Sequence, residues 1–250
     1  ELRWWIGEAA NTDEVLLDEI QAQYDAGFRG VELCMQSDKN ADDMTYAYGS
    51  DMWAHKWRLM MEKYLDLGMT VSLTSGTNWS TSNVPGLDPD SQEAMQCVTK
   101  GSVTVPAGTT LSTLTAPTKH RDVGKFLGAY AYKIVKEEVK EQTNWGQTTY
   151  YTVYEVDYDS MIDLSSQVTQ GDTVWDQNLN WTAPADSNYV VFGMWMEGTA
   201  QSSSPSAETS YATNYFDARG VEALKTFWEE HYLNDPELNQ KIMDGDVQLF

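Results

Sequence analysis

Three short apolar runs, separated by stretches of helical periodicity, constrain the fold of the first third of this chain more than any other feature. The runs are residues 2–6, 30–35 and 69–73. Between them, apolar residues recur every three or four positions over residues 14–28 and 50–67. The runs are apolar throughout instead of alternating with polar residues, which is typical of parallel strands covered by helices. The pattern predicts strand–helix–strand units with parallel strands.

The character of the sequence changes near residue 94. From there to about residue 188, short runs rich in Val, Thr and Tyr are separated by turn-forming residues. This pattern predicts an all-β, sandwich-like insertion. Residues 133–140 (KIVKEEVK) resemble a helix in charge spacing, but their Val and Ile content favours a long strand with a charged edge.

Strand and helix patterns resume at residue 189. We expect a strand at 189–196, helices after it, and a last strand at 247–250. The fold class predicted is therefore α/β, a partial (β/α)8 TIM-like barrel interrupted by the all-β insertion. Its parts would be residues 1–93, the first βα units; 94–188, the insertion; and 189–250, the continuation of the barrel. About five βα steps fit outside the insertion, fewer than a closed barrel needs, so we expect the rest of a longer chain to be a partner.

Composition limits the classes of partner. The net charge of −22 argues against nucleic acid and against membrane surfaces, because both bind basic patches. No apolar stretch is long enough for a membrane-spanning helix. The ten Trp and fourteen Tyr residues offer rings on which the C–H face of a sugar can pack. These features favour a glycan partner and assign no cellular compartment.

The loop after the third run has the composition of a ligand site. It places Asn78 and Ser80 on either side of Trp79, among several further hydroxyl groups. Ligands of parallel α/β folds bind at the carboxyl ends of the strands, where this loop is expected. It could bind a neutral polyol and stack a ring on Trp79. The alternative is a structural loop in which Trp79 closes the barrel mouth.

Three carboxylates also merit attention as site residues. Glu8 and Glu197 follow predicted strands, where function is favoured, although Glu8 could instead cap a helix. Glu32 lies inside an apolar run, where an unpaired charge is unfavourable. It is therefore either paired with a cation such as Arg3 or directed into a polar site.

Short motifs occur in one order along nearly the whole chain. They are RWW at 3–5, AGFRGVEL at 26–33, YGS at 48–50, LGM at 67–69, GTNWSTS at 76–82, DLS at 163–165, VWD at 174–176, YVVFG at 189–193, NYFD at 214–217 and WEE at 228–230. In these motifs the chain resembles the family 106 glycoside hydrolases, the α-L-rhamnosidases.

The resemblance implies a (β/α)8 barrel with β insertions that hydrolyses rhamnose-containing glycans with inversion and depends on calcium. It also implies that an important carboxylate follows Phe250, so that residues 1–250 alone would be inactive. The sequence specifies no catalytic residue and no calcium ligand. The alternatives are a non-catalytic carbohydrate-binding protein and a scaffold of a larger glycan-processing enzyme. The residues expected to line the sugar site are Trp4, Glu8, Glu32, Asn78, Trp79, Ser80 and Glu197.

Overall fold

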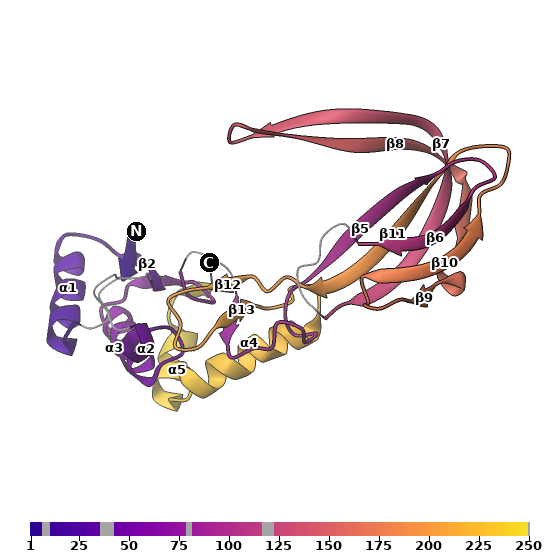
Figure 1. The fold of residues 1–250 in the computed structure, drawn as a ribbon. Coiled ribbons are helices and arrows are strands. Elements are labelled where there is room, and N and C mark those ends of the chain that lie inside the picture. The colour runs from indigo at the N-terminus through magenta and orange to yellow at the C-terminus, as the bar shows by residue number, and fades with distance from the viewer. Residues whose placement is uncertain (7–10, 36–42, 79–81, 117–122, 250) are drawn as a thin grey trace. The chain divides into compact units, whose positions relative to one another are not determined.

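The computed structural model describes residues 1–6, 11–35, 43–78, 82–116 and 123–249. The chain divides into two units (Figure 1). Residues 1–95 and 199–250 form one, called here the α/β unit, and residues 96–198 form the other, the β unit. Within the described residues, no helix is long and apolar enough to cross a membrane.

The α/β unit is built on a parallel sheet in the order β1-β2-β3-β14. Its strands are β1 (Leu2–Ile6), β2 (Gly30–Met35), β3 (Thr70–Leu73) and β14 (Val247–Leu249). The parallel pairing expected of the first three runs is confirmed. The pairing also fixes the faces of the sheet, because residues in register point to the same side.

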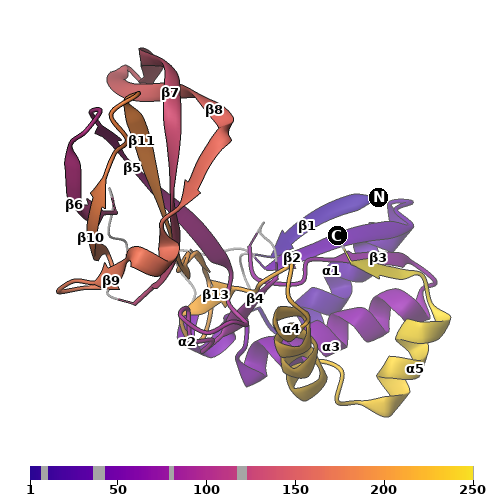
Figure 2. The same ribbon diagram turned by 90° about the vertical axis from the view of Figure 1, so that its right-hand side faces the viewer.

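Helices cover one face of this sheet (Figure 2). They are α1 (Asp13–Asp25), α3 (Asp51–Asp66), α4 (Ala218–His231) and α5 (Pro236–Asp244), while the short helix α2 (Asp43–Tyr46) contacts α3. The strands add in chain order, and right-handed crossovers in one direction place every crossover helix on the same side. Ser50 caps α3 by accepting the Trp53 amide, as its place before the helical pattern predicts. The core between helices and sheet contains Leu33, Val71, Trp57, Met60 and Trp228.

A small antiparallel sheet completes the α/β unit. It pairs β4 (Asn83–Pro85) with β13 (Ser210–Ala212), and β13 with β12 (Ser202–Ser203). Segments more than one hundred residues apart are thus joined beside the loop that follows β3.

The β unit contains two antiparallel sheets, ordered β5-β11-β7-β8 and β6-β10-β9. The elements are β5 (Gln96–Val105), β6 (Thr110–Thr115), β7 (Lys125–Asn144), β8 (Gln147–Asp163), the 3-10 turn η1 (Ser165–Gln167), β9 (Thr169–Gln170), β10 (Asp176–Thr182) and β11 (Tyr189–Gly198). Side chains such as Trp175, Leu179 and Trp195 form its core. Residues 133–140 lie within β7, so the strand prediction for KIVKEEVK is confirmed.

The predicted partial (β/α)8 barrel is wrong. Four separate sheets are formed among the described residues, and none closes into a barrel. The run at 189–196, expected to be a barrel strand, belongs to β11, which pairs antiparallel with β5 and β7. The physical reason is that both faces of β11 are apolar, so its sequence does not show the alternation of apolar and polar residues that is typical of an antiparallel strand. Val191 and Trp195 enter the core, while Phe192 and Met194 on the other face are also apolar, so β11 resembles a strand of a parallel sheet.

Candidate functional site

The sheet face opposite the helices carries a polar row across all four strands of the parallel sheet. Arg3, Glu32, Ser72 and Gln248 occupy one register line. Two nitrogens of Arg3, Nε and Nη2, lie 2.9 Å from Glu32 Oε2. Gln248 Nε2 donates to Ser72 Oγ at 2.9 Å. Glu32 is therefore paired with Arg3 on the polar face of the sheet. Its part in sugar binding stays a prediction.

The loop after β3 is tied down by hydrogen bonds to its neighbours. Tyr48 Oη donates to the carbonyl oxygens of Ser75 and Asn83, at 3.3 and 3.2 Å. Asn83 Oδ1 accepts the Thr77 amide at 3.0 Å, and Asn83 Nδ2 donates to Ser210 Oγ. Burial raises the pKa of Tyr48 well above its usual value, so its hydroxyl remains a donor. The side chains of Tyr48 and Asn83 therefore hold the backbone of this loop at Ser75 and Thr77.

Asn78 adopts a positive φ of 58° at the end of the described part of this loop. Its Nδ2 donates to the Ser204 carbonyl at 3.1 Å, and its own carbonyl accepts from Cys34 Sγ. Cys34 lies two residues after Glu32 on β2, so both point to the polar face. Asn78 is thus held near the carboxyl end of the sheet.

The other predicted site residues lie apart. Trp4 is on the helix-covered face, its ring 6.3 Å from that of Tyr64 in an edge-on contact. Glu197 is in the β unit, 2% exposed, and neither carboxylate oxygen has a hydrogen-bond partner in the described part of the chain. Glu8, Trp79 and Ser80 lie outside the described residues. Trp4 follows Arg3 on β1, and Arg3 is in register with Glu32, so Trp4 and Glu32 point to opposite faces of the sheet.

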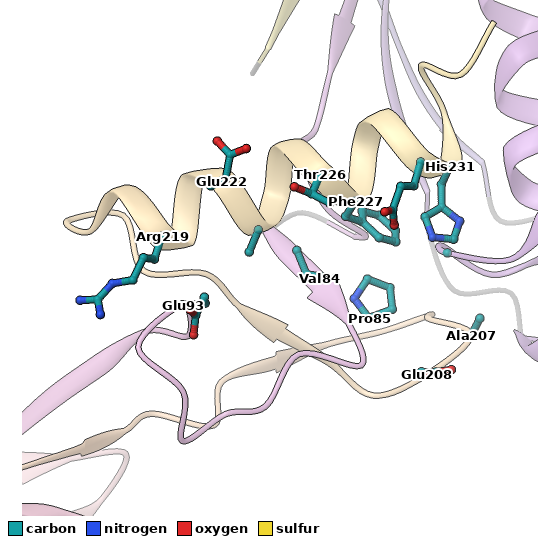
Figure 3. A pocket seen from close by; sticks show the side chains of 13 residues that line it. Val84, Pro85, Glu93, Ala207, Glu208, Arg219, Glu222, Thr226, Phe227 and His231 are labelled. Carbon is teal, nitrogen blue, oxygen red and sulfur yellow. The ribbon is translucent and has the colours of Figure 1, made fainter.

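A pocket of about 540 Å³ lies in the α/β unit between α4, β4 and residues 207–208 (Figure 3). Gly49 lies against its apolar side: a Cβ added there would be 2.7 Å from Pro85 Cγ and 3.6 Å from Phe227 Cζ. The Phe227 ring also packs on the His231 ring, with centroids 4.6 Å apart. Gly49 precedes α3, Val84 and Pro85 belong to β4, and Phe227 belongs to α4, so the pocket joins separate parts of the chain.

Carboxylates dominate the polar lining of the pocket. They belong to Glu93, Glu208, Glu222 and Glu230. Glu222 is 3.2 Å from Lys225. The carboxylates of Glu208 and Glu230 make no hydrogen bond or ion pair with another described residue, so both can accept hydrogen bonds from a ligand.

Arg219 lines the same pocket, but its guanidinium is engaged. It hydrogen-bonds both carboxylate oxygens of Asp217 and the side chain of Gln92. The hydrogen bonds from Arg219 lower the pKa of Asp217 to about 2. Asp217 also caps α4 by accepting the Arg219 amide. The pocket therefore offers acceptors beside an apolar wall, a combination that suits the hydroxyls and C–H face of a sugar ring.

The sequence expectations omitted this pocket, although one signal was present. Arg219, Glu222, Thr226 and Glu230 recur every three or four residues along α4, beside the apolar stripe of that helix. Such spacing places them on one face. The contributions of β4 and residues 207–208 carry no comparable pattern, because tertiary pairing alone brings them together.

The described residues hold no group of three or more His, Cys, Asp or Glu side chains placed to bind a metal ion. Calcium dependence stays a prediction.

Comparison with known proteins adds one structural relationship. No family model and no curated protein matches the sequence. A rhamnosidase from Novosphingobium sp. PP1Y matches the structure with a TM-score of 0.60 and 12% sequence identity. The chain shares the fold of part of that rhamnosidase. The match covers 94% of this chain and 37% of the rhamnosidase chain, so this chain spans less than half the length of that protein.

Proposed function

We propose that this chain is a sugar-binding part of a glycoside hydrolase that acts on rhamnose-containing glycans. The observation that carries the proposal is the fold shared with a rhamnosidase over 94% of the chain. The ordered sequence motifs, which resemble those of the α-L-rhamnosidases, support the same substrate class independently of the fold. Hydrolysis is proposed for the whole protein and sugar binding for these 250 residues.

The pocket along α4 is the proposed place of the sugar. A pyranose ring would pack its C–H face on Phe227 and Pro85, while Glu208 and Glu230 accept its hydroxyl hydrogens. An anionic sugar is disfavoured because four carboxylates line the pocket and the chain carries a net charge of −22. Rhamnose, a neutral deoxysugar, has a C–H face for the apolar wall and carries no negative charge.

A non-catalytic carbohydrate-binding protein is the second candidate. Glycoside hydrolysis generally uses two carboxyl groups, one as acid and one as base or nucleophile. On the polar sheet face, Glu32 is already engaged by Arg3. This pairing withholds Glu32 from an acid or base role, and it is the observation that favours the second candidate for this face of the sheet.

Hydrolysis of 4-nitrophenyl α-L-rhamnoside by a protein that carries this chain tests the proposal. We expect release of nitrophenol, and an increase of about tenfold in KM when Glu208→Gln and Glu230→Gln are combined, because each removes a charge-assisted hydrogen bond. Glu229→Gln is the matched control, since Glu229 is on the same helix and is not part of the pocket lining. Absence of hydrolysis by that protein, with rhamnose binding retained, would select the second candidate.

A further inference from the structure

The outer face of the larger sheet in the β unit carries a cluster of aromatic rings. Phe192 on β11 points away from the core that Val191 and Trp195 enter. Tyr132 on β7 is 6.1 Å from it, and Tyr154 on β8 is 6.2 Å from it. Tyr158 lies 6.3 Å from Tyr132. Tyr132, Tyr154, Tyr158 and Phe192 together are called the aromatic platform.

The platform is not a second core of the β unit. The smaller sheet packs on the opposite face, and its strand β10 contributes Leu179 and Trp181 to the core cluster between the two sheets. Tyr158 is 80% exposed, and the other three rings are half-buried. A contiguous aromatic surface that is partly open to solvent is a feature of interaction sites.

Hydroxyl groups are interleaved with the rings. Thr104 Oγ1 and Tyr154 Oη are 3.1 Å apart, and Ser102 is the cross-strand neighbour of Phe192. Lys100 lies beside the cluster, with its Nζ 5.0 Å from the centroid of the Phe192 ring. Flat rings with hydroxyls between them suit the alternating C–H and O–H surfaces of a carbohydrate.

The ring series continues along the ribbon that β7 and β8 form beyond the end of β11 (Figure 1). Tyr150 faces the same side as Tyr154, four residues along the strand, or about 13 Å away. At the tip, Trp145 is fully exposed and has a φ of 51°, followed by Gly146 at 78°. Two-residue turns of this type favour Asn or Gly at the first position, and a bulky residue there is strained. The turn therefore holds an exposed indole at the tip of the ribbon.

Carboxylates beside these rings favour a neutral polymer over an anionic one. Glu137 is opposite Tyr154 and Glu141 is opposite Tyr150, on the same face of the ribbon. Carboxylates at these positions repel an anionic chain, and the net charge of −22 adds to the effect. The spread of rings along the strands exceeds the size of one sugar unit.

We infer that the aromatic platform and the ribbon with Tyr150 and Trp145 bind an extended neutral polysaccharide. This surface belongs to the β unit and is separate from the α4 pocket, so it does not depend on the proposed hydrolase function. It would hold a polymeric substrate whether or not the pocket binds its terminal sugar.

Affinity electrophoresis of the 250-residue chain tests this inference, with gels containing galactomannan, xyloglucan or a neutral rhamnan, and polygalacturonate as the anionic comparison. We expect retardation in at least one neutral gel and none in polygalacturonate. Trp145→Ala and Tyr158→Ala each remove an exposed ring and are expected to weaken that binding about tenfold. Phe216→Ala is the control, because Phe216 is fully exposed in the α/β unit, and it should change nothing.

The inference is overturned if no neutral polysaccharide retards the chain, or if retardation survives both ring substitutions. It is equally overturned if sedimentation shows that Trp145 and Tyr158 mediate self-association instead. L-rhamnose titration of the same variants separates the two proposals. If the polysaccharide inference is overturned but Trp145→Ala binds rhamnose with unchanged affinity, the proposed function still stands. If the chain binds no rhamnose but its retardation by a neutral polysaccharide depends on the rings, the inference about the aromatic platform still stands.

Discussion

Arg3 and Glu32, on the adjacent strands β1 and β2, are joined by two contacts of 2.9 Å to a single carboxylate oxygen. The Glu32 side chain is 11% exposed and that of Arg3 is 46% exposed. The guanidinium therefore compensates a carboxylate that is largely removed from water. The pair occupies the face of the sheet that the helices leave open.

Removing the cation should destabilise the protein. Arg3→Met leaves the Glu32 carboxylate buried without its partner, and we expect a loss of about 1–2 kcal/mol in the free energy of unfolding, reduced from the fully buried case because Arg3 is half-exposed. Urea unfolding measures it. The double variant Arg3→Met/Glu32→Gln should recover part of the loss, and a single variant as stable as the parent would show that the pair contributes nothing.

Replacement of Glu197 should stabilise the protein, in contrast to replacement of Arg3. Both of its carboxylate oxygens are buried without a hydrogen-bond partner among the residues described. Glu197→Met replaces the buried carboxylate by an apolar chain of similar length, and we expect a gain of about 1–3 kcal/mol. Glu138→Met, an exposed position in the same unit, should stay within about 0.5 kcal/mol of the parent. A marked loss of stability in Glu197→Met would mean that the carboxylate has a favourable partner in solution.

The Asp217–Arg219 ion pair should make the stability of the protein depend on pH in the acid range. The pKa of Asp217 falls to about 2 in the folded protein, below its unfolded value of about 3.9. Its contribution is therefore fully present above about pH 4 and is lost as the pH falls through about 2. Asp217→Asn retains a good helix cap without the charge. Its urea midpoint should lie below that of the parent at pH 7 and converge with it toward pH 2; a constant difference would refute the assignment.

Substitution of Trp4 distinguishes a role in the core from a role in sugar binding. Its edge-on contact with Tyr64 places it among residues packed on the helix-covered core. Trp4→Ala should therefore cost about 3 kcal/mol of stability, as large-to-small core substitutions do. Rhamnose affinity, measured at a temperature where the variant remains folded, should be unchanged. A selective loss of affinity would restore Trp4 to the sugar site.

Local sequence patterns were sufficient for part of this fold. The helical period after Ser50 and the apolar runs at 30–35 and 69–73 lie where α3, β2 and β3 form. Those elements are specified by neighbours within a few residues, through capping and periodic burial. The β character of residues 133–140 was visible for the same reason.

The failures depend on long-range pairing. The residues of β11 are apolar on both faces, so nothing local distinguishes the antiparallel neighbour β5 from a parallel one. The pocket joins Gly49, Pro85, Glu208 and Phe227, which only tertiary contacts bring together. Trp4 and Glu32 are each plausible site residues in isolation. Strand register places them on opposite faces.

Titration of the 250-residue chain with L-rhamnose, followed by NMR, tests the central claim most directly. We predict saturable shifts, an affinity about tenfold lower in the combined variant Glu208→Gln/Glu230→Gln, and an unchanged affinity in Glu229→Gln. Contradiction would come from a chain that shows no saturable response to rhamnose, or from a response that the pocket variant leaves intact.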